Sequence, residues 1–189
     1  MLRRMRCHLL CEDREQESFF RPILERMFGR VYVEARKPKQ AGGFSFVFQS
    51  YAGLVRKFPR GNPKESVGLV VVVDGDKEGR ASRLEELNRR LEMAGEARRL
   101  PTDRIAACVP TRNVETWELW LCGRHDLNEF DDYRADFQAL KKTGPMSSRQ
   151  AAKAWFHQTS QAEATAEGKK LPSLVEARAE LERLSRMTG

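Results

Sequence analysis

The 189-residue sequence lacks the features of several large classes of protein. No apolar run approaches the roughly 20 residues that a membrane-spanning helix needs. After the basic start MLRRMR, the apolar stretch from Cys7 to Cys11 is short, and Glu12 and Asp13 then interrupt it, which disfavours a signal peptide. These absences predict a cytoplasmic protein that does not associate with membranes.

Cysteine and histidine are also scarce. The four cysteines form no C-x-x-C pair and no evident metal-ligand set, so reduced and mostly buried thiols are expected. His8, His125 and His157 stand in no motif with a nucleophilic serine or cysteine. The G-x-x-x-x-G-K-[ST] loop that cradles a triphosphate is absent as well. Nucleophilic catalysis and phosphotransfer from small nucleotides are therefore disfavoured.

Positive charge is concentrated in the first third of the chain. Residues 1–60 hold 13 Lys or Arg and 6 Asp or Glu, whereas residues 61–189 hold 21 of each. The whole formal net charge of +7 thus lies in the first segment. Such a bias favours a polyanion partner such as nucleic acid, although a generic solvated basic surface has the same composition.

Hydrophobic periodicity predicts alternating strands and helices. Strands are expected at 6–11, 31–33, 67–73 and 105–109, and helices at 14–28, 44–58, 82–93 and 113–121. The strand at 67–73 lacks polar alternation, so both of its faces should be buried. This order predicts an α/β fold with an open, mostly parallel four-stranded sheet flanked by helices.

The last third of the chain has a different texture. Residues 123–189 are predicted to form a helical extension packed on an α/β domain of residues 1–122. Helices are expected at 148–159 and 173–187, and the polar stretch 160–170 is expected to be a loop. Ser173 and Glu176 have the spacing of a capping box at the start of the last helix.

Carboxylates follow three of the predicted strands. Glu12 and Asp13 follow the first strand, Asp74 and Asp76 follow the third, and Glu115 lies on the helix after the fourth. The carboxyl ends of parallel strands share one edge of a sheet, so these acids should converge. Crowded carboxylates need a cation, and oxygen ligands suit Mg²⁺ or Mn²⁺. The alternative is a set of turn and solvated helix residues, since D-G-D is also an ordinary turn signal.

The chain resembles a TOPRIM domain in three features taken together. These are a first strand that ends in Glu, a later apolar strand that ends in D-x-D, and this order of strands and helices. TOPRIM domains occur in topoisomerases, primases and OLD-family nucleases. With N-V-E-T-W-E-L-W-L after the fourth strand, the chain is most similar to small stand-alone bacterial TOPRIM-like proteins related to OLD nucleases, over about residues 5–122. Proteins of that type are linked to phage defence and can act beside an ATPase partner.

The resemblance implies roles for individual residues. Glu12, Asp74 and Asp76 would be catalytic and would hold Mg²⁺ or Mn²⁺, with Glu12 as a metal ligand or general acid/base. Glu115 would be a further metal ligand, and Trp117 a core residue beneath it.

Two positions depart from the family pattern. Asp13 stands where a Gly is usual, and Gln16 stands where OLD-like members carry an acid, although Glu15 and Glu17 flank it. The sequence therefore leaves open whether one or two metals bind, with Glu15 as the substitute ligand.

Basic side chains near the predicted site are candidate contacts for nucleic-acid phosphates. They are Lys77 and Arg80 after the D-x-D, Arg112 at the fourth strand tip, and Arg36, Lys37 and Lys39 in the basic segment after the second strand. Solvated surface residues are the alternative for each.

The leading hypothesis is a metal-dependent nuclease acting on DNA or RNA. The other is a non-enzymatic module that binds nucleic acid or a partner ATPase. Both a monomer and a homo-oligomer stay open.

Overall fold

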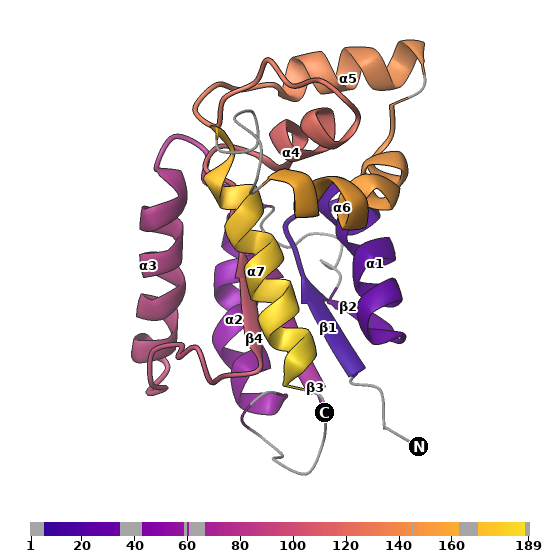
Figure 1. The fold of residues 1–189 in the computed structure, drawn as a ribbon. Helices are drawn as coiled ribbons and strands as arrows, with labels where there is room; N and C mark the ends of the chain where they lie inside the picture. Colours follow the sequence, from indigo (N-terminus) through magenta and orange to yellow (C-terminus); the bar gives the residue numbers. More distant parts are fainter. Residues whose placement is uncertain are drawn as a thin grey trace.

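In a computed structural model, the described parts of the chain are residues 6–34, 43–58, 60, 67–144, 146–162 and 170–187. The first eight elements alternate between strand and helix (Figure 1). They are β1 (Arg6–Leu10), α1 (Arg14–Phe28), β2 (Val31–Glu34), α2 (Phe44–Lys57), β3 (Val67–Val72), α3 (Gly79–Met93), β4 (Ile105–Cys108) and α4 (Val114–Leu121). Three helices follow, α5 (Arg134–Thr143), α6 (Ser148–Ala162) and α7 (Pro172–Arg186). No helix within these ranges is long and apolar enough to cross a membrane.

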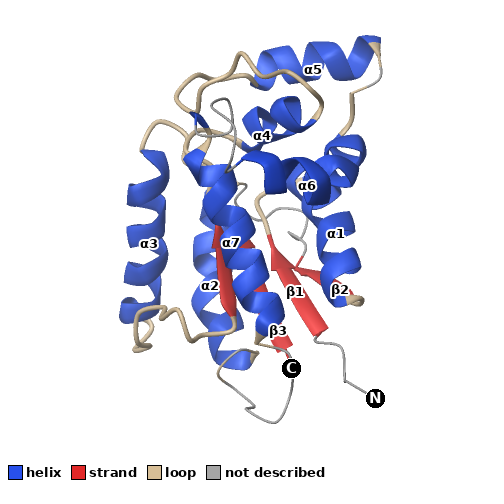
Figure 2. Cartoon of the chain, viewed as in Figure 1, coloured by secondary structure: helices blue, strands red, loops and turns tan. Residues whose placement is uncertain are grey.

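The four strands form one parallel sheet in the order β2-β1-β3-β4. All six residues of β3 are buried, as expected for a central strand with helices on both faces (Figure 2). Leu10 pairs with Val71, so β1 and β3 end at the same level. The predicted α/β fold with a four-stranded parallel sheet is confirmed, and the carboxyl ends of β1 and β3 are neighbours.

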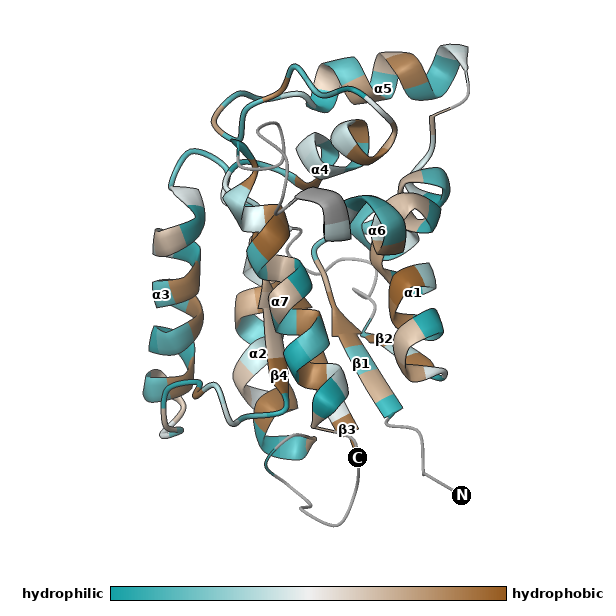
Figure 3. Ribbon diagram, in the orientation of Figure 1, coloured by the Kyte–Doolittle hydropathy of each residue, from teal (hydrophilic) through white to brown (hydrophobic). Residues whose placement is uncertain are grey.

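Alternating side chains of the strands supply two hydrophobic cores, one on each face of the sheet. On one face, Cys7 and Leu9 pack with residues of α1, α4, α6 and α7. On the other face, Leu10 and Val71 pack with residues of α2 and α3. Figure 3 shows hydrophobic and hydrophilic bands alternating along the helices around the sheet.

The helices after residue 122 share the first of these cores. Phe137 of α5, Trp155 of α6 and Leu174 of α7 belong to the same buried cluster as Phe19 and Trp117. Trp117 is fully buried, as the sequence predicted. The C-terminal helices therefore pack directly on the α/β part of the chain, while the domain boundary at residue 122 stays a prediction.

Two local features of the C-terminal part differ from expectation. Helix α5 was not predicted; it follows the Asp- and Arg-rich stretch 123–136, and Phe137 is its one buried residue, with Leu140 packed beside the same core. Helix α6 continues through Ala162, beyond the predicted start of the polar loop at 160. The remainder of that predicted loop, 163–169, lies outside the described residues.

The predicted capping box of α7 is wrong. The helix begins at Pro172, with Leu171 as N-cap, because proline suits the first helical position. A carboxylate from a distant loop supplies the cap instead: Glu129 Oε1 accepts the Ser173 N–H at 2.8 Å and the Ser173 hydroxyl at 2.6 Å. Glu176 forms an ion pair with Arg80.

Candidate functional site

The carboxyl edge of the sheet brings Glu12 and Asp74 into contact. Each residue lies two positions after the end of its strand, β1 or β3, and these strands are hydrogen-bonded neighbours. The backbone N–H of Asp74 donates to Glu12 Oε1 at 2.7 Å. The other oxygen, Oε2, lies against Gly43, where an added Cβ would sit 3.1 Å away. The convergence of these two predicted residues is therefore present in the fold.

Asp74 also caps helix α4. Its Oδ1 accepts the Val114 N–H at 3.1 Å, while the Asn113 side chain at the N-cap position makes no capping bond. A carboxylate here satisfies an N–H that has no partner within the helix, and it is favoured by the helix dipole. Asp74 consequently has a structural role in addition to any role in binding.

Burial and mutual repulsion disfavour negative charge in this group. Burial, followed by the charges of Glu12 and Glu115, raises the pKa of Asp74 well above its usual value. Burial likewise raises the pKa of Glu12 to about 7, although the Asp74 N–H opposes the shift. Near neutral pH these coupled carboxylates therefore favour uptake of a proton or of a cation.

Asp76 points to arginines rather than to the other acids. Its carboxylate contacts Arg134 at 3.0 Å and Arg83 at 3.6 Å. Its backbone has φ of 50°, a left-handed conformation that Asp adopts more readily than most residues. Because β3 ends at Val72, strand alternation does not govern residues 74–76, and Asp74 and Asp76 do not present their carboxylates in the same way.

Gly75 is required by a close approach of two backbone segments. An added Cβ would lie 2.1 Å from the Thr111 carbonyl oxygen and 2.6 Å from that of Pro110. The Gly75 N–H donates to the Pro110 carbonyl at 3.1 Å. The loop after β4 therefore fills the space beside this glycine.

Two further acids are buried on α4. Burial raises the pKa of Glu115 to about 7, and its Oε2 has no hydrogen-bond partner among the described residues. Burial also raises the pKa of Glu118 well above its usual value, although the Ser148 hydroxyl opposes the shift. Glu118 was not among the predicted site residues, although it lies one turn after Glu115 on the same side of the helix.

The two departures from the TOPRIM pattern form the start of α1. Asp13 Oδ1 accepts the Gln16 N–H at 2.9 Å, and Gln16 Oε1 accepts the Glu12 N–H at 2.9 Å. This reciprocal pair resembles a capping box and fixes the backbone of Glu12. Glu15, the predicted substitute ligand, instead pairs with Lys141 at 2.6 Å and accepts the Ser148 hydroxyl.

The predicted phosphate-binding residues have different surroundings. Arg36, Lys37 and Lys39 lie outside the described residues. Lys77 is exposed next to the acids. The other two arginines have partners within the chain: Arg80 pairs with Glu176, and Arg112 donates to the Asp76 carbonyl at 3.1 Å.

Across the described residues, no three His, Cys, Asp or Glu side chains are grouped closely enough to hold a metal ion together. The donor chemistry of Glu12 and Asp74 fits a hard divalent cation, because both offer carboxylate oxygens whose charge is uncompensated. Asp76 fits less well, since arginines occupy its carboxylate. In comparisons with known proteins, no family model, curated protein or solved structure matches this chain.

Proposed function

We propose that the chain is a metal-dependent nuclease of the TOPRIM type, which cleaves phosphodiester bonds of DNA or RNA. The observation that carries the proposal is the part-buried contact of Glu12 with Asp74 at the carboxyl edge of a parallel sheet. Perturbed pKa values at such an edge are typical of functional sites. A cytoplasmic location and an action in phage defence beside an ATPase partner belong to the same proposal.

Glu12, Asp74 and Asp76 would hold Mg²⁺ or Mn²⁺, with Glu115 nearby. A bound ion supplies charge stabilisation and an activated water. Glu12 is suited to move a proton at its carboxylate near neutral pH, because its pKa is about 7. The Asp74 N–H orients that carboxylate, and Asp76 has to exchange Arg134 for the cation. The left-handed backbone of Asp76 supports a functional role, because strained residues cluster at sites.

A second candidate is a non-enzymatic module that binds nucleic acid or a partner ATPase. The ion pairs of Asp76 with Arg134 and Arg83 favour it, because they neutralise one of the predicted ligands. In that case the acids would stabilise the loops at the edge of the sheet, as Asp74 does for α4.

A cleavage assay with Asp74→Asn and Asp76→Asn separates the two candidates. Asn at position 74 keeps an oxygen for the Val114 N–H, so the fold should persist while charge is lost. We expect each variant to lose Mg²⁺- or Mn²⁺-dependent nicking of DNA or RNA by about 100-fold or more, and EDTA to abolish it in the wild type.

The matched control is Asp126→Asn, which removes an exposed acid paired with Arg124 and should leave nicking unchanged. Unchanged activity in the double variant of Asp74 and Asp76 would exclude the nuclease site. Binding of nucleic acid without cleavage under any divalent ion would favour the second candidate.

A further inference from the structure

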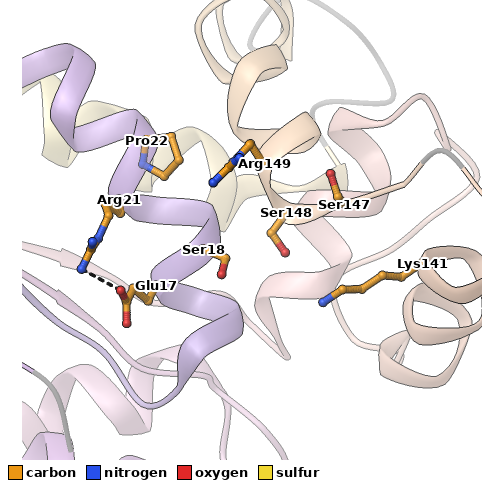
Figure 4. A pocket seen from close by; sticks show the side chains of 8 residues that line it. All are labelled: Glu17, Ser18, Arg21, Pro22, Lys141, Ser147, Ser148 and Arg149. Atoms are coloured by element: carbon orange, nitrogen blue, oxygen red, sulfur yellow. Dashed lines mark ion pairs between the residues drawn. The ribbon is translucent and has the colours of Figure 1, made fainter.

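An open pocket of about 350 Å³ lies outside the acid cluster, between the first half of α1, the end of α5 and the start of α6 (Figure 4). Its volume is at the lower end of the range for ligand sites, roughly 300 to 1,000 Å³. The lining is polar apart from one proline. The lining residues are Glu17, Ser18, Arg21, Pro22, Lys141, Ser147, Ser148 and Arg149.

Cations outnumber acids among the lining residues, and one of the three cations, Arg149, has no ion pair with the described acids. Arg21, Lys141 and Arg149 come from three different helices, and Glu17 is the one acid among the lining residues. Arg21 pairs with Glu17 at 2.7 Å, so these two charges largely cancel. Arg149 is exposed. Figure 4 shows the side chains of Lys141 and Arg149 extending toward the space between α1 and α6.

Hydrogen-bond donors accompany these cations. The hydroxyls of Ser18, Ser147 and Ser148 line the same pocket. Helix α6 begins there with 15 residues, and the first N–H groups of a helix have no partner inside it. Lys141 and the Ser148 hydroxyl are engaged by Glu15. The lining groups that no described acid engages are the Arg149 guanidinium and the Ser18 and Ser147 hydroxyls. Together with the helix start, these groups match the oxygens of a phosphate group, which accept charge-assisted hydrogen bonds.

Glu15 connects this pocket to the acid cluster. Its carboxylate holds Lys141 at 2.6 Å and accepts the Ser148 hydroxyl, so it positions one lining residue from α5 and one from α6. Glu15 lies in the first turn of α1, three residues after Glu12. A group bound in the pocket would therefore lie beside the helix that begins at the proposed catalytic edge.

We propose that this pocket binds a phosphate group. Its source is either the backbone of a nucleic acid strand or a free phosphate monoester, which present the same oxygens. The choice of a nucleic acid strand rests on the proposed nuclease function, because the pocket would then anchor the strand beside the cleavage site. Binding of phosphate itself does not depend on that function.

The test compares Arg149→Ala with Lys153→Ala at constant ionic strength and in EDTA, so that no cleavage occurs. Lys153 is exposed on α6 outside the pocket lining, and its loss removes the same charge from the same helix. One arm measures binding of a fluorescent single-stranded oligonucleotide by anisotropy. The other measures the rise in melting temperature with inorganic phosphate, using chloride as the reference anion. Circular dichroism verifies that both variants fold.

We expect Arg149→Ala to weaken binding about three- to tenfold in at least one arm, because one charge-assisted contact is lost, and Lys153→Ala to change it much less. Loss in the oligonucleotide arm alone identifies strand phosphates, and loss in the phosphate arm identifies a free phosphate. Equal loss in both variants, or no loss in either, would overturn the proposal. Asp126→Asn, which removes an exposed acid outside both sites, should bind as the wild type does. The phosphate arm is measured in EDTA and involves no cleavage, so its result is separate from the fate of the nuclease site.

Discussion

The two ends of the parallel sheet differ in whether their acidic side chains have cationic partners. At the amino end, the loop from α3 leads into β4. Arginines at the end of α2 and just after it form ion pairs with acids of this loop: Arg56 pairs with Glu96 at 2.7 Å, and Arg60 pairs with Asp103 at 2.6 Å. The hydrogen bond from Arg56 lowers the pKa of Glu96. At the carboxyl end, burial raises the pKa of Glu12 to about 7.

The free side of β4 shows the same balance as the amino end. Glu180 of α7 accepts the Ala107 N–H at 3.3 Å and pairs with Arg99 at 2.7 Å. Arg183 donates to the Ile105 carbonyl, so the exposed edge of the sheet has side-chain partners. Acids at the amino end and beside β4 therefore have arginine partners. The uncompensated acids at the carboxyl end mark a region suited to binding rather than to stability alone.

The largest expected effect comes from Gly75→Ala, which breaks the carboxyl end of the sheet. The new Cβ would lie 2.1 Å from a backbone oxygen that cannot move independently of the loop after β4. We expect a loss of about 3 kcal/mol or more in the free energy of unfolding, measured by urea titration. The matched control is Gly53→Ala on α2, where nothing lies within 4 Å and a helical Ala should stabilise by about 0.5 to 1 kcal/mol. Equal stability of the two variants would contradict the close approach.

A smaller effect is expected from Glu115→Gln, and its sign depends on pH. The pKa of Glu115 is raised from 4.5 to about 7 on folding, so the native state binds the proton more tightly. This group therefore reduces wild-type stability progressively as pH rises from 4.5 to about 7. The variant should be more stable than the wild type by about 2 kcal/mol at pH 8 and should gain nothing at pH 4. Thermal melts across this range measure the difference.

The control for that comparison is Glu85→Gln on α3. A hydrogen bond from Arg98 lowers the pKa of Glu85, so this variant should gain no stability at pH 8. A gain in both variants would mean that replacing a glutamate stabilises the protein wherever it lies, and that burial at the carboxyl end is not the cause.

The smallest effect is expected at the balanced end, from Arg56→Ala. Its side chain is 62% exposed, and exposed ion pairs contribute little because water and salt screen them. We expect no resolved change in melting temperature at 0.15 M salt. A large destabilisation would show that the arginine ion pairs at the amino end contribute strongly to the stability of the fold.

Much of the fold could be predicted because its signals are local. The uninterrupted apolar run ending at Val73 predicted a strand buried on both faces, and the spacing from Phe19 to Phe28 predicted α1. Asp74 could be placed at the sheet edge for the same reason. Helix α5 was not predicted, although Phe137 and Leu140 have helical spacing and pack against the same core. The helix is short, and only Phe137 is fully buried. Glu118 was not predicted as a site residue because a glutamate in a helix is normally expected to face solvent. Only the packing of the helices shows that it is buried.

The sequence by itself determined the order of strands and helices, since apolar spacing and caps act over a few residues. It also predicted that Glu12 and Asp74 follow strands of one parallel sheet, whereas the adjacency of those two strands came from the structure. Only the tertiary structure decided their partners. Asp74 caps a helix that begins 40 residues later, and Asp76 meets Arg134, 58 residues away. Such choices depend on how loops pack and on which charges become buried together, and no local pattern encodes that.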